Sequence, residues 1–145
     1  MKKTNYILGV DGGGTFTGAY LFNQLGHTIA EESTSGTNLY SCQEKAINRL
    51  INLIINISDK SKVSLSEINA FGFALSGVSD VNQRELLLKE LDKLNISKKS
   101  IILSDSEAAF NLLCPTGIGI MVSVGTGIMC LARDLQGKSY TVAGK

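Results

Sequence analysis

Two stretches of the sequence, one near each end, follow the same order of strands and turns. The first copy has expected strands over 7–10, 16–22 and 27–32, joined by a glycine–threonine turn and then by a polar turn that ends in glycine. The second copy repeats this order, with expected strands over 120–124, 128–132 and 139–143. This internal repeat constrains the fold most, because it predicts two similar three-stranded units. The alternative interpretation is a chance likeness between two glycine-containing hairpins.

The turn after the first strand has the residue types of a phosphate-binding loop. The glycines at 12–14 leave no side chain to block a ligand, and their N–H groups, with the Thr15 hydroxyl, suit phosphate oxygens. Asp11 stands where its carboxylate could hold a hydrated cation. A tight hairpin turn without a ligand is the alternative, since glycine clusters mark turns in general. A comparable turn at 125–127 favours two lobes that hold one nucleotide between them.

Composition and charge exclude several classes of protein. The chain has 145 residues, 43% hydrophobic and 19% charged, which predicts a globular protein with a real core. The net charge of +1 argues against a nucleic-acid binder. Cys42, Cys114 and Cys130 form no Cys-x-x-Cys pair, which argues against a disulfide framework and against zinc or iron–sulfur sites. Neither a signal peptide nor a membrane span is recognisable, so we expect a cytoplasmic protein.

Between the two copies, helix and strand patterns alternate. Apolar residues at helical spacing predict a helix over 41–58, and an apolar run predicts a buried strand over 70–75. A capping pattern at Asp80 begins a second helix, a short strand follows over 100–103, and a third helix opens over 104–107. Strands that alternate with helices predict a parallel continuation of the sheet.

Polar residues follow three of the expected strands. Asp11, Ser76–Gly77 and Asp105 stand at the carboxyl ends of these strands, where sheets of this kind bind ligands. We therefore expect them at one edge of the sheet. The alternative for Asp105 is that its carboxylate only caps the helix that follows.

Five motifs spread over the whole chain together resemble one protein family. They are Gly9-Val10-Asp11-Gly12-Gly13-Gly14-Thr15, Gly36-Thr37-Asn38, Phe71-Gly72-Phe73-Ala74-Leu75-Ser76-Gly77, Ser104-Asp105-Ser106-Glu107-Ala108-Ala109 and Ser123-Val124-Gly125-Thr126-Gly127. They resemble the N-acetylglucosamine kinase branch of the BadF/BadG/BcrA/BcrD ATPase family, which shares its fold with actin, hexokinase and the heat-shock chaperone ATPases. The resemblance implies an α/β protein, with a ribonuclease-H-like lobe and a mixed sheet over 1–116. The first strands of a second, similar lobe would follow over 117–145.

The resemblance also implies a kinase that uses ATP and Mg²⁺ to phosphorylate a hydroxyl of an amino sugar. Asp105 would bind the acceptor hydroxyl and act as the general base, while Asp11 would hold Mg²⁺ through water. Further contacts to the sugar would come from Asn38, Ser76 and Gly77. The phosphates of ATP would be bound by Gly12, Gly13, Gly14, Thr15, Gly125, Thr126 and Gly127. Without the resemblance, Asn38 would be interpreted as a turn residue after Gly36.

The sequence departs from the family pattern in two places. Ile128 and Met129 follow the second loop, where the family's sugar kinases usually carry a serine and a polar neighbour. This departure favours a related hexosamine, or another acceptor, over N-acetylglucosamine itself. The chain is also considerably shorter than family members, so we expect the isolated piece to be inactive, and residues 117–145 to pack irregularly or to pair with another chain. The expected partner is a small-molecule sugar, with no nucleic acid or membrane and with a homodimer left open.

Two other functions stay open. One is an ATPase activator of a radical dehydratase or reductase, whose iron–sulfur ligands would have to come from outside these residues. The other is a non-enzymatic, sugar-sensing member of the same fold, although such regulators more often carry a DNA-binding segment ahead of the first strand.

Overall fold

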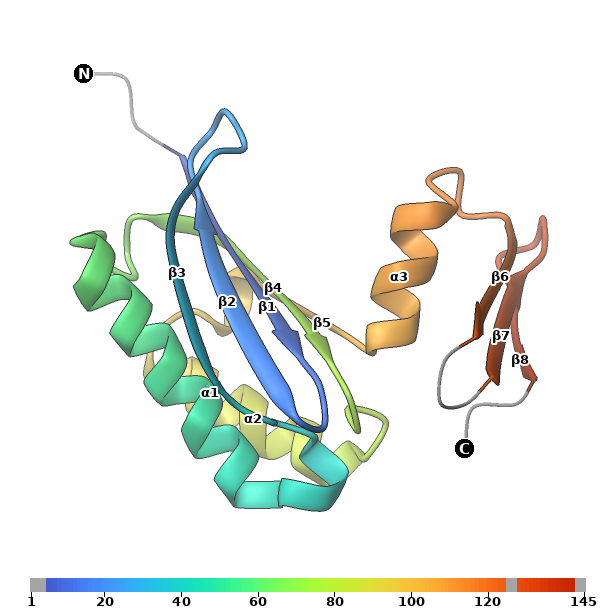
Figure 1. Cartoon of the computed structure of the whole chain (residues 1–145), viewed down its shortest axis with the longest axis horizontal. Coiled ribbons are helices and arrows are strands. Elements are labelled where there is room, and N and C mark those ends of the chain that lie inside the picture. Colours follow the sequence, from blue (N-terminus) through green and yellow to red (C-terminus); the bar gives the residue numbers. More distant parts are fainter. Residues whose placement is uncertain (1–4, 125–127, 143–145) are drawn as a thin grey trace. The chain divides into compact units, whose positions relative to one another are not determined.

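The computed structural model describes residues 5–124 and 128–142, which form two compact units (Figure 1). The first unit ends at Asp105 and the second begins at Ser106. Within the described ranges, no helix combines the length and the apolar character needed to cross a membrane.

The first unit is built on a five-stranded mixed sheet with the strand order β3-β2-β1-β4-β5. Three strands form an antiparallel meander, and β4 and β5 continue the sheet in parallel with β1. The strands are β1 (Tyr6–Gly12), β2 (Phe16–Phe22), β3 (Thr28–Ser35), β4 (Ile68–Leu75) and β5 (Ser100–Leu103). The expected mixed sheet and its two parallel strands are therefore confirmed.

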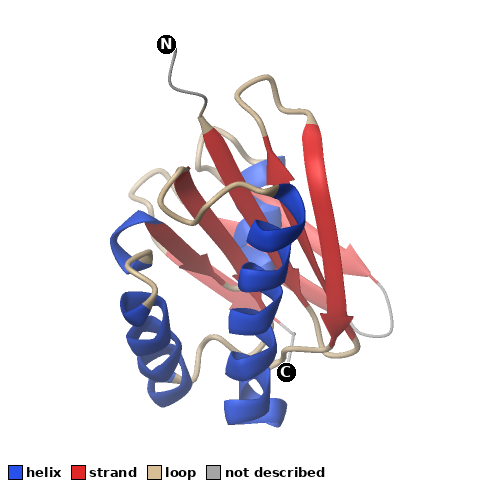
Figure 2. Cartoon of the chain, turned by 90° about the vertical axis from the view of Figure 1, so that its left-hand side faces the viewer, coloured by secondary structure: helices blue, strands red, loops and turns tan. Residues whose placement is uncertain are grey.

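Two helices cover one face of this sheet (Figure 2). They are α1 (Leu39–Ser61) and α2 (Val81–Lys93), and a short 3-10 helix, η1 (Ser97–Lys99), leads into β5. Successive strand residues point to opposite faces, so Leu8 and Val10 of β1 join the apolar side chains of both helices in one buried core. Ile7 and Asp11 alternate with them and are exposed.

Side-chain caps determine where the two helices begin. The Asn38 side chain accepts a hydrogen bond from the N–H of Ser41, so α1 starts slightly earlier than its apolar spacing predicts. The chain leaves α1 at Lys62, which is in the left-handed conformation with φ of 60°. At α2 the Asp80 carboxylate accepts a hydrogen bond from the N–H of Gln83, which confirms the capping pattern expected there.

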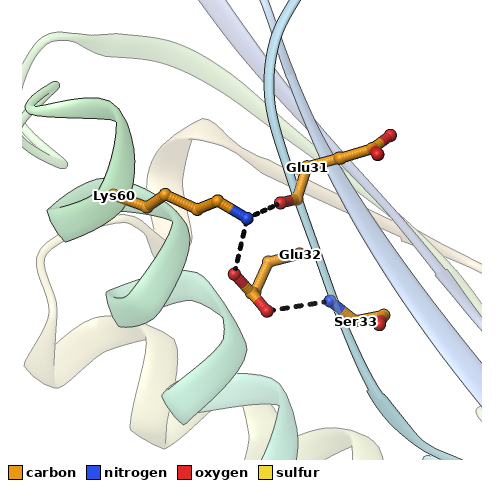
Figure 3. Close-up of polar contacts among 4 residues, drawn as sticks. All are labelled: Glu31, Glu32, Ser33 and Lys60. Atoms are coloured by element: carbon orange, nitrogen blue, oxygen red, sulfur yellow. Dashed lines mark hydrogen bonds and ion pairs between the residues drawn. The ribbon is translucent and has the colours of Figure 1, made fainter.

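The last turn of α1 is tied to β3, which is an edge strand (Figure 3). The Lys60 ammonium donates to the backbone carbonyl of Glu31 (2.8 Å) and to the carboxylate of Glu32 (3.1 Å). The N–H of Ser33 also donates to that carboxylate, at 3.4 Å. The hydrogen bond from Lys60 is the main cause that lowers the pKa of Glu32 below its ordinary value of 4.5.

The second unit contains one helix and a three-stranded antiparallel sheet with the order β6-β7-β8. Its elements are α3 (Asp105–Leu113), β6 (Gly119–Val124), β7 (Ile128–Arg133) and β8 (Ser139–Val142). Phe110 of α3 is fully buried in a small core with Met121 and Leu131. This packing groups α3 with the later strands, whereas the expected boundary lies near residue 116.

Irregular packing, one of the two outcomes expected for residues 117–145, is not observed in the described part of this range, and pairing with another chain stays a prediction. The three strands pair in continuous register because the meander satisfies its own backbone hydrogen bonds. Several apolar side chains of the sheet are nevertheless exposed, and Ile120 and Val124 on β6 are 72% and 74% exposed.

The second turn of each meander is built in the same way. In each, the side-chain oxygen of the first residue, Asn23 or Asp134, accepts hydrogen bonds from two backbone N–H groups of the turn. The fourth residue, Gly26 or Gly137, has φ of 79° or 78°, and its N–H donates to the carbonyl of the first residue. The two meanders therefore match in strand order and in turn geometry, which confirms the internal repeat.

Candidate active site

The candidate site residues of the first unit gather at one edge of the five-stranded sheet. The parallel register sets Gly12 of β1 beside Leu75 of β4, and Ala74 of β4 beside Leu103 of β5. The carboxyl ends of these three strands consequently meet. Asp11, Ser76–Gly77 and Asp105 all lie at this edge, as expected from the strand order.

Backbone hydrogen bonds hold the glycine loop over 12–15 from both sides. On one side, the N–H of Ser76 donates to the Gly12 carbonyl at 2.8 Å. On the other side, the N–H of Gly36 donates to the Thr15 carbonyl at 2.9 Å. The loop is thus preorganised by segments that precede α1 and follow β4, rather than by its own turn alone.

A buried pair of hydroxyls supports this arrangement. Thr17 and Thr37 are both fully buried, and their side-chain oxygens are 2.8 Å apart in a hydrogen bond. The N–H of Thr37 donates to the carbonyl of Gly13 at 2.9 Å. The sequence alone does not predict this pair, since two threonines twenty positions apart give no local signal.

The glycines around the loop serve two different purposes. A Cβ on Gly12 would lie 2.6 Å from the Thr37 hydroxyl, and a Cβ on Gly36 would overlap the Gly14 carbonyl. The fold itself therefore requires glycine at 12 and 36. At Gly14 a Cβ would meet no atom of the described residues within 4 Å, and its φ is outside the left-handed region. Gly14 is exposed, so the space beside its backbone is open to a ligand.

Asn38, Ser76 and Gly77 are brought together beside this loop. The Asn38 amide donates from Nδ2 to the Ser76 hydroxyl at 3.0 Å, while its Oδ1 caps α1. Gly77 has φ of 78°, and a Cβ there would lie 2.6 Å from the Asn38 Oδ1. The amide nitrogen carries a second hydrogen, so one side chain can both cap the helix and contact a ligand hydroxyl.

The two carboxylates at this edge are exposed. Asp11 pairs with Gly18 and Ala74 through its backbone, so its side chain points to the face that α1 and α2 leave uncovered. Asp105 is the first residue of α3, and Ser104 stands directly before the helix. A carboxylate at the start of a helix can cap it with one oxygen, so capping and another role for Asp105 are compatible.

A single exposed carboxylate suits a Mg²⁺ ion that keeps most of its water. Among the described residues, no three His, Cys, Asp or Glu side chains gather into a metal-binding group. Mg²⁺ in phosphate-transfer sites is usually bound by one or two carboxylates together with the phosphates of the substrate. Asp11 fits that pattern. The second glycine turn, Gly125, Thr126 and Gly127, lies outside the described residues, between β6 and β7.

Comparison with known proteins assigns this architecture to a family. The model of the BadF/BadG/BcrA/BcrD ATPase family matches residues 8–145. The chain belongs to this family. Its five-stranded mixed sheet is the first lobe of the actin-like ATPase fold, and its three-stranded sheet is the start of the second lobe.

Two curated relatives are named as kinases of amino sugars. The N-acetylmuramic acid/N-acetylglucosamine kinase of Clostridium acetobutylicum is 26% identical over 140 residues, which cover 96% of this chain and 46% of that protein. Glucosamine kinase GspK of Vibrio cholerae serotype O1 is 26% identical over 144 residues, which cover 97% of this chain and 47% of that protein. The BadF/BadG/BcrA/BcrD chain described here therefore spans about half the length of the curated relatives it matches.

Solved structures share the fold across proteins of different function. A candidate N-acetylglucosamine kinase from Porphyromonas gingivalis is 23% identical with a TM-score of 0.70, over 88% of this chain and 44% of that one. A reductive activator for a corrinoid, iron–sulfur protein is 14% identical with a TM-score of 0.61, over 99% of this chain and 31% of that one. Fold alone therefore does not separate the kinases of this group from the activators.

Proposed function

We propose that the full-length protein transfers the γ-phosphoryl group of ATP to a hydroxyl of an amino sugar. The observation that carries this proposal is the position of Asn38 and Ser76. Their amide and hydroxyl meet at 3.0 Å directly beside the glycine loop, at the edge where Asp105 also lies. Groups suited to sugar hydroxyls thus adjoin groups suited to phosphate, as a sugar kinase requires.

Phosphoryl transfer depends mostly on positioning and on neutralising charge, with one carboxylate for the nucleophile. In the proposed mechanism Asp105 accepts the proton of the attacking hydroxyl, while Asn38 and Ser76 orient the sugar. The Gly14 N–H and the Thr15 hydroxyl contact the phosphates, whereas the Gly13 N–H closes the turn by donating to the Phe16 carbonyl at 3.0 Å. Asp11 would hold a Mg²⁺ ion through water, and the ion would supply positive charge beside the phosphates.

The amino-sugar acceptor is proposed from the relatives and from one departure in the sequence. Both curated relatives carry names of amino-sugar kinases, at 26% identity over about half their length. Ile128 and Met129 follow the second loop in place of the polar residues expected of an N-acetylglucosamine kinase. Ile128 is 59% exposed. An apolar residue at this place favours a hexosamine other than N-acetylglucosamine.

The test is an assay of the full-length protein with ATP, Mg²⁺ and a panel of N-acetylglucosamine, N-acetylmuramic acid, glucosamine and N-acetylgalactosamine. ADP release is measured, and the phosphorylated product is identified by mass. We expect release that depends on one of the sugars and yields one sugar phosphate. ADP release in the absence of any sugar would instead favour the ATPase-activator function. Sugar binding without turnover would favour the sugar-sensing function.

A further inference from the structure

The backbone of α1 is interrupted one turn after its start. Gln43 has φ of 45° and ψ of −125°, which is far from helical values and is rarely adopted by residues other than glycine. Gln43 is exposed, so packing of its own side chain does not impose this conformation. It therefore has to be maintained by contacts on either side of it, and strained residues of this kind tend to occur at functional sites.

The short turn before Gln43 is anchored to the end of β4. The N–H of Leu39 donates to the Ser76 carbonyl at 3.0 Å, and the Leu39 side chain is fully buried. The Asn38 amide donates to the Ser76 hydroxyl, and the Asn38 carbonyl accepts from the N–H of Cys42 at 2.9 Å. Hydrogen bonds thus attach the first turn of α1 to the Ser76 loop.

The long part of α1 after Gln43 is anchored elsewhere. Ala46 and Leu50 are fully buried in the core beneath the sheet. Arg49 donates from Nη1 to the Gly36 carbonyl at 2.7 Å, and Gly36 in turn holds the Thr15 end of the glycine loop. This part of the helix is therefore held by packing in the core and by the hydrogen bond to Gly36 beside the glycine loop.

Gln43 joins these two anchored parts, and an open groove of about 630 Å³ lies beside it. The groove is lined by Gln43 itself, by Arg49 of the long part and by Gln83 of α2. The Gln83 Oε1 is buried, with no hydrogen-bond partner among the described residues. Gln43 thus lies at an open surface that the kinked segment shares with α2.

We infer that Gln43 is a positioning residue for the acceptor site: its positive-φ backbone lets α1 stay packed in the core while its first turn holds Asn38 against Ser76. This inference rests on the proposed function, because Asn38 is one of the proposed sugar contacts. The backbone conformation, and not the glutamine side chain, carries the role.

Two substitutions of Gln43 distinguish the effect of its backbone conformation from the effect of its side chain. Glycine adopts positive φ without strain, so Gln43→Gly should leave the KM for the sugar close to that of the wild type. Valine is strongly disfavoured at positive φ, so Gln43→Val should raise the KM for the sugar roughly tenfold or more through misplacement of Asn38. The KM for ATP should change less than the KM for the sugar, because the Thr15 end of the glycine loop is held through Gly36 and Arg49, on the far side of Gln43.

Lys62 provides the matched control on the same helix. It also has positive φ, at 60°, but it lies at the opposite end of α1. Lys62→Val and Lys62→Gly should change the melting temperature without changing the KM for the sugar. A rise in the sugar KM of Lys62→Val equal to that of Gln43→Val would overturn the inference, as would equal rises in Gln43→Gly and Gln43→Val.

Amide hydrogen exchange of the full-length protein provides a readout that does not need activity. The N–H groups of Leu39 and Cys42 should exchange faster in Gln43→Val and at wild-type rates in Gln43→Gly. Unchanged protection in Gln43→Val would also overturn the inference. Two further results are separable. Faster exchange in Gln43→Val would support the role of Gln43 in holding the first turn of α1. If the wild-type protein at the same time showed no sugar-dependent ATP turnover, the proposed kinase function would be refuted.

Discussion

Asp105 lies where strand β5 passes into helix α3, at the edge shared with Ser76 and the glycine loop. If its carboxylate is the general base, Asp105→Asn in the full-length protein should lower kcat roughly a hundredfold or more, because that is the usual contribution of general-base catalysis. Asparagine retains the capacity to cap a helix, so folding should be little affected. Steady-state kinetics with saturating ATP and sugar measures the effect.

Two further variants show whether the loss is specific to Asp105. Asp92 is a carboxylate of α2 that accepts a hydrogen bond from the Ser97 hydroxyl at 2.7 Å, ahead of the amino end of β5, and Asp92→Asn should leave kcat unchanged. Asp11→Asn should instead weaken Mg²⁺-dependent nucleotide binding. If Asp105→Asn retained its turnover, Asp105 would be interpreted only as a cap of α3.

Gly14 and Gly36 are in contact through the backbone, yet they should respond oppositely to alanine. A Cβ at Gly14 meets no atom of the described residues, so Gly14→Ala should keep the melting temperature but raise the KM for ATP roughly tenfold, since the methyl group occupies the approach of a phosphate. A Cβ at Gly36 overlaps the Gly14 carbonyl, so Gly36→Ala should cost about 2 kcal/mol or more of stability. Thermal unfolding and ATP kinetics distinguish the two. An unchanged KM for ATP in Gly14→Ala would contradict a phosphate-binding loop.

At the scale of elements, the contact between the end of α1 and edge strand β3 should make stability depend on pH. The pKa of Glu32 is lowered, chiefly by the hydrogen bond from Lys60, so the ionised form stabilises the fold above the ordinary pKa of 4.5. That stabilisation is lost as pH falls through the lower pKa of the folded state. Glu32→Gln should therefore lower the melting temperature at pH 7, with the difference vanishing in acid.

Glu67 is the control for this effect. Its pKa is lowered as well, mainly by the hydrogen bond from the Ser64 hydroxyl, which is a neutral group. Added salt screens the Glu32–Lys60 pair and should shrink the effect of Glu32→Gln, while the effect of Glu67→Gln should persist. Equal sensitivity of both variants to salt would show that Lys60 is not the source of the Glu32 effect.

At the scale of the whole molecule, the chain contains one lobe and the three-stranded start of a second. The chain spans about half the length of its curated relatives. We therefore expect the 145-residue chain alone to show no sugar-dependent ATP turnover, because closure of two lobes is needed to exclude water and complete the phosphate site. The full-length protein, assayed in parallel, is the positive control. Turnover by the short chain would contradict the two-lobe mechanism.

The sequence by itself determined the elements and their order. Apolar residues at helical spacing and alternating or continuous apolar runs predicted the strands and helices to within a few residues, because these patterns reflect local backbone periodicity and burial. The capping pattern at Asp80 and the matching turns at Asn23 and Asp134 are likewise local, and the structure contains all three. The shared edge of Asp11, Ser76 and Asp105 followed from strand order, which topology rules constrain.

Only the tertiary structure decided which side chains meet at this edge of the five-stranded sheet to form the candidate active site. The Asn38–Ser76 contact, the buried Thr17–Thr37 pair and the bond from Arg49 to the glycine-loop region join residues far apart in sequence. No local pattern encodes such contacts, since each partner is an ordinary polar residue until the sheet assembles. The positive φ of Gln43 is also beyond a local pattern: nothing in a glutamine predicts a kink, and Gln43 joins a first turn bonded to Ser76 to a longer part packed in the core.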